Sequence, residues 1–505
     1  MNFRSKRIRK HRLNLAQKIA KEQEAPNTTN QKQISTYSKN KLSWKKIAII
    51  IGILLIPLIV YAGFDKFNIA NPIASTVLKT VGKTLPTDAY GYTNFLLLGT
   101  GDVGHEGQNL TDTIIVASFN PKTKQGLMFS IPRDLYIKAD GYYGQKINSL
   151  FANALAETNS EAAAYKVLES AVTQITNRPI HRRILVTFSA FENIVDEMGG
   201  ITFTVPEAIY DTSYPNENYG YQTFKIDAGL QTLDGATALK YARSRHTSND
   251  YARSRRQQDI ILALKENAKT SGILTSPGKI SAIYEDLKTG IKTNLETREI
   301  IQLAGYAAEF DRNNLLNLQL HDDPSQKGGF LYTPPRYLYN NTFVLLPLGN
   351  NYNIIHKYLD LHYEHSDIMN IPRTLQILNG TPTGGLASSV KAILQRFGFV
   401  IVRHGNATSK TITTTTLYNK NPLAPTKLQN ALKSIFNFTE SNTTPPEYLI
   451  EPYISEADYI LELGADSTAT INQILNNQYV PPAPPDPAQA TEPTESTEPT
   501  FNTQL

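Results

Sequence analysis

Two copies of the pentapeptide YARSR, at residues 241–245 and 251–255, bring several arginines close together in the chain. The arginine guanidinium is planar and its donors match phosphate oxygens, so this density predicts an anionic partner such as a pyrophosphate. If residues 250–258 form a helix, Arg255 points away from the cluster, because residues three and four positions apart share a face. The residues on that shared face are Arg253, Arg256 and Gln257.

The upstream arginines, Arg243 and Arg245, follow the end of a predicted helix. An extended segment there directs both side chains to the same side, because alternate residues of an extended chain share a side. The two copies of the pentapeptide therefore contribute different arginines to one cluster, and Asp250 could orient one of them. The alternative is a solvated basic helix that makes surface ion pairs.

Two aspartates, Asp102 and Asp112, lie in the glycine-rich stretch LLGTGDVGHEGQNLTDTII between two predicted strands. The chain has no cysteine, which excludes disulfides, thiolate metal sites and cysteine nucleophiles. Two carboxylates suit a hard cation such as Mg²⁺, which binds oxygen ligands and retains water molecules. The alternative is a pair of ordinary loop aspartates that cap turns. Other charged candidates are Arg133 and Asp134 at a predicted strand end, and Lys146 in QKIN.

The segments that must position these residues alternate between strand and helix. NFLLLGT predicts a strand from Asn94, and residues 113–120 and 126–132 predict a hairpin because two apolar runs flank a Pro/Lys turn. Residues 149–176 have helical periodicity, and Asp234 is a predicted helix N-cap. The alternation predicts an α/β or α+β layered fold.

Residues 47–64 form an uncharged, apolar run of eighteen residues, which can span a bilayer at the short end of the usual range. Residues 1–46 hold thirteen Lys/Arg and two Glu, so the positive-inside rule places that end in the cytoplasm. We therefore expect a single-pass protein of the cell membrane whose folded domains are extracytoplasmic. A cleaved signal peptide fits less well, because forty-six residues precede the apolar run.

The predicted organisation has six segments. They are a basic disordered cytoplasmic tail (1–46), a transmembrane helix (47–64), a stalk (65–92), a catalytic domain with an extension (93–365, core 93–270), a small βαβ-type domain (368–467) and a disordered tail rich in Pro, Thr and Glu (468–505).

Several motifs resemble, in order and spacing, those of the LytR-CpsA-Psr family over residues 93–270. The motifs are NFLLLGT, TDTIIVASFNPKT, SIPRDLYI, KIN, GLQTLDGATALKYARSRH and DYARSRRQQD. ILNGTPTGGLASSVKAILQRFGFVI and ADYILELGAD resemble the C-terminal accessory domain of many members. The resemblance implies a central sheet flanked by helices and a Mg²⁺-dependent phosphotransferase. Such an enzyme moves an anionic glycopolymer, such as teichoic acid or capsule polysaccharide, from a polyprenyl-pyrophosphate carrier to peptidoglycan and forms a phosphodiester.

The same resemblance implies roles for individual residues. Asp102 and Asp112 would hold Mg²⁺, and one of them would accept the proton of the attacking sugar hydroxyl. Arg133 would contact a phosphate near the metal, and the apolar region between sheet and helices would admit the polyprenyl chain. The residues implied at the pyrophosphate are Arg243, Arg245, Asp250, Arg253 and Gln257.

The sequence departs from the family pattern at two positions. Leu110 stands where many members have an arginine, so one phosphate contact is missing or is supplied by Lys146. Gly101 separates Asp102 from the strand end, where the first aspartate of the family usually follows at once.

Two other functions stay open at this stage. One is a non-catalytic envelope scaffold that binds wall polymer, and the other is a pyrophosphatase that releases the polymer into water. The expected partners are the lipid-linked glycopolymer, peptidoglycan and the cytoplasmic membrane. Nucleic acid is not expected, because the arginine cluster lies on the far side of the predicted membrane helix from the basic tail.

Overall fold

The structure is a computed structural model that describes most of the chain between residues 85 and 471. Within the described ranges, no helix combines the length and the apolar composition needed to cross a bilayer. The predicted membrane helix (47–64), the N-terminal tail and most of the C-terminal tail lie outside them. The described residues are 85–104, 107–139, 141–197, 199–216, 220–244, 250–270, 290–296, 299, 302–303, 306, 312–369, 374–420, 427–469 and 471.

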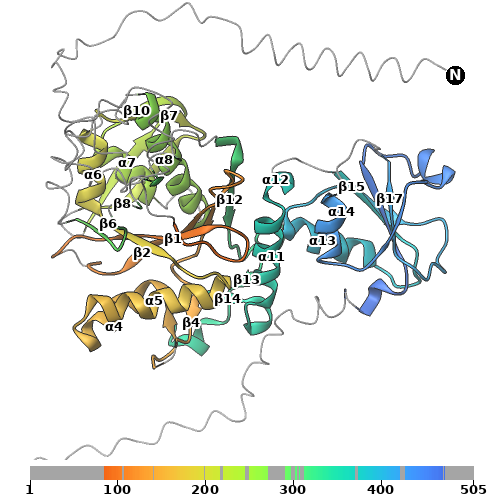
Figure 1. The fold of residues 1–505 in the computed structure, drawn as a ribbon, viewed down its shortest axis with the longest axis horizontal. Coiled ribbons are helices and arrows are strands. Elements are labelled where there is room, and N and C mark those ends of the chain that lie inside the picture. The colour runs from red at the N-terminus through yellow and green to blue at the C-terminus, as the bar shows by residue number, and fades with distance from the viewer. Residues whose placement is uncertain are drawn as a thin grey trace, which may run out of the picture. The chain divides into compact units, whose positions relative to one another are not determined.

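A six-stranded mixed sheet forms the centre of the larger domain (Figure 1). Its strands, in order across the sheet, are β11 (Ile291–Thr293), β6 (Arg182–Thr187), β1 (Thr93–Thr100), β2 (Thr111–Phe119), β3 (Gly126–Ser130) and β12 (Leu315–Gln319). β1 is antiparallel to β2 and parallel to β6, and β12 is parallel to β3. The predicted hairpin is confirmed as the antiparallel pair of β2 and β3.

Helices cover both faces of this sheet, as the predicted layered fold requires (Figure 1). Successive strand residues face opposite sides, so Leu96 and Leu98 of β1 pack with the side chains of α4 and α5, whereas Leu97 packs on the other face. The central sheet with flanking helices is therefore confirmed. The helices are α4 (Ile147–Thr158) and α5 (Glu161–Thr176) on one face, and α6 (Phe188–Glu197), α7 (Gly235–Arg243) and α8 (Asp250–Thr270) on the other.

The helical periodicity predicted over residues 149–176 is confirmed, although the segment forms two helices because the chain breaks between α4 and α5. Asn159 adopts a left-handed conformation with φ of 49° and ends α4, and asparagine tolerates that conformation. Ser160 then caps α5 by accepting a hydrogen bond from the backbone N–H of Ala163 at 3.3 Å. The predicted N-cap at Asp234 is confirmed by its hydrogen bond from the N–H of Thr237 at 2.8 Å.

Short antiparallel strand pairs extend the large domain at several points. The two longer pairs pack on the α6–α8 side of the sheet, where their side chains join one apolar cluster with those helices. The pairs are β7 (Ile201–Val205) with β10 (Gly229–Leu233), β8 (Ile209–Pro215) with β9 (Tyr221–Ile226), β4 (Tyr136–Ile137) with β5 (Gln145–Lys146), and β13 (Leu331–Tyr332) with β14 (Leu346–Pro347).

The C-terminal residues form a second, five-stranded sheet. β15 (Thr374–Asn379), α13 (Leu386–Phe397) and β16 (Val400–Asn406) make a parallel βαβ unit, as predicted. Gly398 ends α13 with φ of 97°, a backbone conformation that favours glycine. The remaining elements are β17 (Thr416–Asn419), α14 (Lys427–Lys433), β18 (Thr439–Ser441) and β19 (Tyr459–Leu463), and the strand order is β16-β15-β19-β17-β18.

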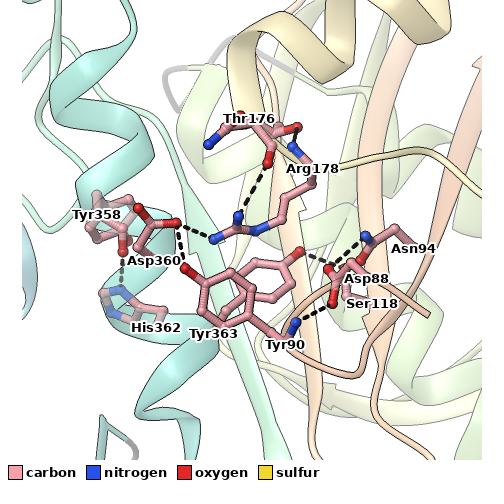
Figure 2. A network of polar contacts seen from close by, with 11 residues as sticks. Asp88, Tyr90, Asn94, Ser118, Thr176, Arg178, Tyr358, Asp360, His362 and Tyr363 are labelled. Atoms are coloured by element: carbon pink, nitrogen blue, oxygen red, sulfur yellow. Dashed lines mark hydrogen bonds and ion pairs between the residues drawn. The ribbon is translucent and has the colours of Figure 1, made fainter.

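Helix α11 (Asn353–Glu364) joins the central sheet through a polar network (Figure 2). The guanidinium of Arg178 forms an ion pair with Asp360 and lies over the rings of Tyr90 and Tyr363, at 4.3 and 4.7 Å. The Tyr363 hydroxyl is 2.5 Å from that of Ser118 on β2. Arg178 and Tyr363 are buried, and the network gives the Tyr363 hydroxyl and the Arg178 guanidinium polar partners from other segments.

Candidate active site

Asp112 projects from an irregularity in the central sheet. The ladder between β1 and β2 pairs Gly99 with Thr113 and Thr100 with Thr111, so Asp112 is an extra residue in a β-bulge. A bulge redirects a side chain that would otherwise point into a face of the sheet, and bulges are frequent beside active sites. The sequence predicted Asp112 in the loop just before a strand, whereas the structure places it inside β2, at a bulge that the spacing does not reveal.

Positive charge and hydrogen bonds surround the Asp112 carboxylate. Its Oδ1 accepts hydrogen bonds from Arg133 at 2.9 Å and from the amide of Asn148 at 3.1 Å. Burial alone would raise the pKa of Asp112, but Arg133, Asn148 and the charge of Arg253 together hold that pKa below its usual value. Asp112 is therefore ionised at neutral pH.

Helix α8 presents two predicted side chains to the same cavity. Arg253 is buried and Gln257 is half-buried, one turn apart, and both line a cavity of about 510 Å³ together with Asp112. Arg255 is exposed, as the helical spacing predicted. Arg256 lies on the same buried side of α8 but does not line the cavity. Its guanidinium donates hydrogen bonds to the backbone carbonyls of Tyr241 in α7 and of Ser244, the residue after α7.

Arg243, the last residue of α7, closes another side of this cavity. Its guanidinium lies 4.1 Å from the ring centre of Phe188 at the start of α6, and both side chains line the cavity. An arginine stacked on an aromatic ring keeps its fork of donors available at the edge. Arg243 comes from α7, Arg253 and Gln257 come from α8, and the structure brings all three to one cavity.

The end of α7 is held by a buried contact that the sequence did not reveal. The Ser244 hydroxyl donates a hydrogen bond to Asp211 of β8 at 2.7 Å, and Arg256 donates to the carbonyls of Tyr241, at 2.9 Å, and Ser244. Ser244 belongs to the first YARSR copy, and Arg256 directly follows the second. The pentapeptide repeat thus fastens α7 to α8 as well as supplying arginines to the cavity.

The β8–β9 hairpin supplies cavity residues that sequence reasoning missed, among them Asp211 and Tyr214. The stretch IYDTSYPNENYGYQTFKI carries a detectable signal, because two strand-like runs flank a turn with Asn and Gly. Nothing in that pattern marks the aspartate as a cavity residue, since its partner Ser244 lies 33 positions further along.

Three predicted site residues, Asp102, Arg133 and Lys146, lie beside the cavity and do not line its wall. Asp102 accepts hydrogen bonds from the backbone N–H of Ser189, at 3.0 and 3.3 Å, in the first turn of α6. Lys146 forms an ion pair with the buried Asp134 at 2.6 Å, and Asp134 also lies 3.4 Å from Arg133. The ammonium of Lys146 thus supports Arg133 through Asp134, instead of lining the cavity.

Two further predicted residues cannot be placed. Arg245 lies outside the described residues, and so does the side chain of Asp250, although α8 begins at that residue.

An apolar cavity of about 120 Å³ lies beside the charged one, between the sheet and α6–α8. The two cavities share wall residues, including Phe188, Arg243 and Gln257. Beyond them the apolar walls come from the sheet and three helices, with residues such as Leu97, Ile115, Phe191, Leu239 and Leu264. A ligand with a charged group and an apolar tail would meet matching surfaces on either side of Arg243.

The carboxylates present fit a small hard cation in part. Among the described residues there is no group of three or more His, Cys, Asp or Glu side chains that could hold a metal ion. Mg²⁺ often binds one or two carboxylates and completes its shell with water and substrate phosphates. Asp112, ionised beside the cavity, is compatible with that arrangement, and Asp102 lies at its margin.

The profile of the LytR_cpsA_psr family matches residues 65–342, more than half of the 505-residue chain. This chain belongs to the LytR_cpsA_psr family. A second profile, described as LytR cell envelope-related transcriptional attenuator, matches residues 373–450. Both resemblances noted in the sequence are therefore confirmed.

Proteins similar to this chain include some that are named teichoic acid transferases and one that is named a cell wall biosynthesis protein. The chain is 27% identical to polyisoprenyl-teichoic acid–peptidoglycan teichoic acid transferase TagU of Oceanobacillus iheyensis, over 56% of this chain and 87% of that protein. It is 26% identical to cell wall biosynthesis protein LcpA of Corynebacterium glutamicum, over 68% and 69% of the two chains. The crystal structure of TagV from Bacillus subtilis aligns with a TM-score of 0.42 and 24% identity, over 55% of this chain and 99% of that one.

Proposed function

We propose that this protein transfers an anionic glycopolymer from a polyprenyl-pyrophosphate carrier to peptidoglycan, forming a phosphodiester at the outer face of the cytoplasmic membrane. The observation that carries the proposal is the junction of a charged cavity with an apolar one at Phe188, Arg243 and Gln257. A lipid pyrophosphate has the same two parts. The names of the relatives, which specify a polyisoprenyl-linked teichoic acid and peptidoglycan, support this choice of substrate.

The donor would bind with its pyrophosphate in the charged cavity. Arg243 and Arg253 present guanidinium groups to that space from α7 and α8, and the Gln257 amide can donate to a phosphate oxygen. Arg245 and Asp250, which neighbour these residues in the chain, would join them. The isoprene units next to the phosphates would enter the apolar cavity, where burial of their surface favours binding.

The reaction needs no energy source beyond the pyrophosphate. The oxygen of an acceptor sugar hydroxyl attacks the phosphorus that carries the glycopolymer, and the bond from this phosphorus to the polyprenyl phosphate breaks. Arg243 and Arg253 would stabilise the charge on the leaving polyprenyl phosphate. The hydroxyl proton passes to a carboxylate, for which Asp112 and Asp102 are the candidates.

Mg²⁺ is the cofactor that we propose for this site, with Asp112 and Asp102 as its protein ligands. When bound, it would neutralise phosphate charge. Arg133 would then serve two purposes, since it already holds Asp112 in place at 2.9 Å and can reach a phosphate near the same carboxylate.

The test compares two arginines on the same helix. The full-length protein in detergent would be given lipid-linked glycopolymer and peptidoglycan. Arg253→Ala should lower the transfer rate by about 10²–10³-fold, the usual cost of one transition-state donor. Arg255→Ala should leave the rate unchanged, because Arg255 is exposed.

Product analysis separates this function from its competitors. Glycopolymer joined covalently to peptidoglycan supports the transferase. Polymer released with a free phosphate, in the presence of acceptor, would show a pyrophosphatase instead. A wild-type protein that binds the donor but never consumes it would show a scaffold, and either result would contradict the proposal.

A further inference from the structure

A second cavity, of about 460 Å³, lies outside the charged site and is lined by tyrosines. Tyr136 comes from β4, Tyr332 from β13, and Tyr339 and Tyr352 from the segments around β14. All four side chains are half-buried, so each ring is packed on one side and accessible on the other. The volume lies in the range of sites that hold small organic ligands.

The rings in this cavity are held in fixed positions. Tyr136 and Tyr339 meet edge to face, with ring centres 4.8 Å apart and an angle of 76°. The Tyr332 hydroxyl donates a hydrogen bond to Asn350 at 2.7 Å, and Asn350 lines the same cavity. Rigid tyrosines give a large amphipathic contact at a low cost in side-chain entropy.

The chemistry of the wall favours a neutral ring with hydroxyl groups. Lys138 is the one charged residue among the described residues that line this cavity, whereas the charged cavity is lined by Arg243, Arg253 and two aspartates. Gln174 and Asn350 add amide groups that can donate and accept hydrogen bonds. A pyranose ring matches this wall, because its C–H face packs on tyrosine while its hydroxyls bind amides.

Contacts connect the tyrosine cavity to the charged site. Tyr136 is the register partner of Lys146, which pairs with Asp134 at 2.6 Å. Asp134 is 3.4 Å from Arg133, and Arg133 is 2.9 Å from Asp112. The strand segment at Leu345 also bonds to the backbone of Asp134 and Tyr136, at 2.9 Å in each case. Tyr136 of the tyrosine cavity is thus linked, through Lys146, Asp134 and Arg133, to the residues that hold Asp112.

We propose that the cavity of Tyr136, Tyr332, Tyr339 and Tyr352 binds pyranose rings of a glycan chain. The inference rests on the proposed function, since a glycan is a substrate only if the protein transfers a glycopolymer to peptidoglycan. Both the glycopolymer of the donor and the peptidoglycan acceptor can provide such rings. The low charge of the wall favours the acceptor glycan over the phosphate-rich donor.

Binding is measured directly on the full-length protein in detergent, by calorimetry. One probe is a soluble peptidoglycan oligosaccharide, and the other is the glycopolymer freed of its lipid. Tyr332→Ala and Tyr339→Ala should each weaken binding of one probe by about tenfold, the loss expected for one aromatic contact. Tyr332→Phe should bind nearly as well as the wild type, because it keeps the ring.

Two further variants exclude simple explanations. Tyr143→Ala removes a tyrosine that is 96% exposed and lies outside the cavity wall, so it should not change binding. Leu338→Trp places a large ring at a cavity position that is 46% exposed, so it should block binding while the fold survives.

The outcomes separate this inference from the proposed function. Loss of oligosaccharide binding in the alanine variants, with binding of the lipid-linked donor kept within about twofold, supports the glycan cavity. Binding of neither probe by the wild type, or equal losses in Tyr143→Ala, overturns it, even if glycopolymer transfer itself is observed. Binding without any transfer would instead overturn the proposed function.

Discussion

At the scale of single residues, Asp112 lies at the bulge of β2 and places its carboxylate on the wall of the charged cavity. Its carboxylate is held by Arg133 and Asn148 and feels the charge of Arg253, which together lower its pKa despite burial. A group whose pKa is lower in the folded state stabilises the fold above its unfolded pKa. That stabilisation is lost as the pH falls through the folded value.

Asp112→Asn should therefore reduce stability at pH 7 by about 1–2 kcal/mol, the usual worth of a charge-assisted hydrogen bond. The difference from the wild type should shrink as the pH falls below the ordinary aspartate value of 3.8. Urea unfolding followed at pH 7 and at pH 3 measures both. Asp227→Asn is the control, since that side chain is 71% exposed. An Asp112→Asn protein as stable as the wild type at pH 7 would contradict the lowered pKa.

The sequence predicted some of these residues well and others not at all. Helical spacing placed Arg253 and Gln257 on one face and Arg255 on another, because that geometry is local to one helix. Asp211 escaped notice because its contact with Ser244 depends on how a hairpin packs on a helix end. Contacts between segments that are distant in the chain cannot be predicted from the local spacing of residue types.

At the scale of elements, the junction between α7 and α8 positions the arginines. Ser244 is held from two sides, with its hydroxyl bound by Asp211 and its carbonyl by Arg256. All three residues are buried, so an unmatched partner would lose a hydrogen bond without gaining one from water. The direction in which α7 delivers Arg243 depends on this contact.

Ser244→Ala should lower the free energy of unfolding by about 1–3 kcal/mol, because it leaves the buried Asp211 carboxylate short of a donor. Hydrogen exchange should quicken at the end of α7 and the start of α8 and stay unchanged in α4. Asp211→Asn keeps the side-chain size and tests the charge separately. Unchanged exchange at both helix ends would show that Ser244 does not organise the junction.

The break between α4 and α5 shows where sequence periodicity stops being informative at this scale. The stretches ALAE (154–157) and EAAA (161–164) on either side of the break consist of good helix formers, so a helical pattern runs through the whole segment. The helix ends because Asn159 turns left-handed and Ser160 starts a new helix as its cap. Two residues therefore decide a boundary that the pattern of apolar residues does not show.

At the scale of the whole molecule, α11 belongs to two packing environments. Arg178 and Ser118 hold one end of it to the central sheet, through Asp360 and Tyr363 (Figure 2). The ring of Tyr358 on the same helix packs with Phe330 and with Phe397 of α13, at 5.2 and 6.2 Å between ring centres. The sequence predicted two domains, but not that their side chains form one apolar cluster.

Phe397→Ala should therefore destabilise both domains together. Phe397 is fully buried, and the loss of such a ring costs about 3–5 kcal/mol. Scanning calorimetry should show one transition that moves to lower temperature as a unit. Val402→Ala, at a position that is 44% exposed, is the control and should have little effect. Two separate transitions, with the larger one unmoved, would show that the domains unfold independently.

The shared helix also limits how the chain can be shortened or recombined. A protein that stopped before Thr374 would leave Tyr358 and Phe330 without Phe397 and expose their rings to water. Exposed apolar surface of this kind promotes aggregation. We therefore expect that the C-terminal domain is not a detachable module, and that a chimera which exchanged it between relatives would need a matching aromatic residue at the Phe397 position.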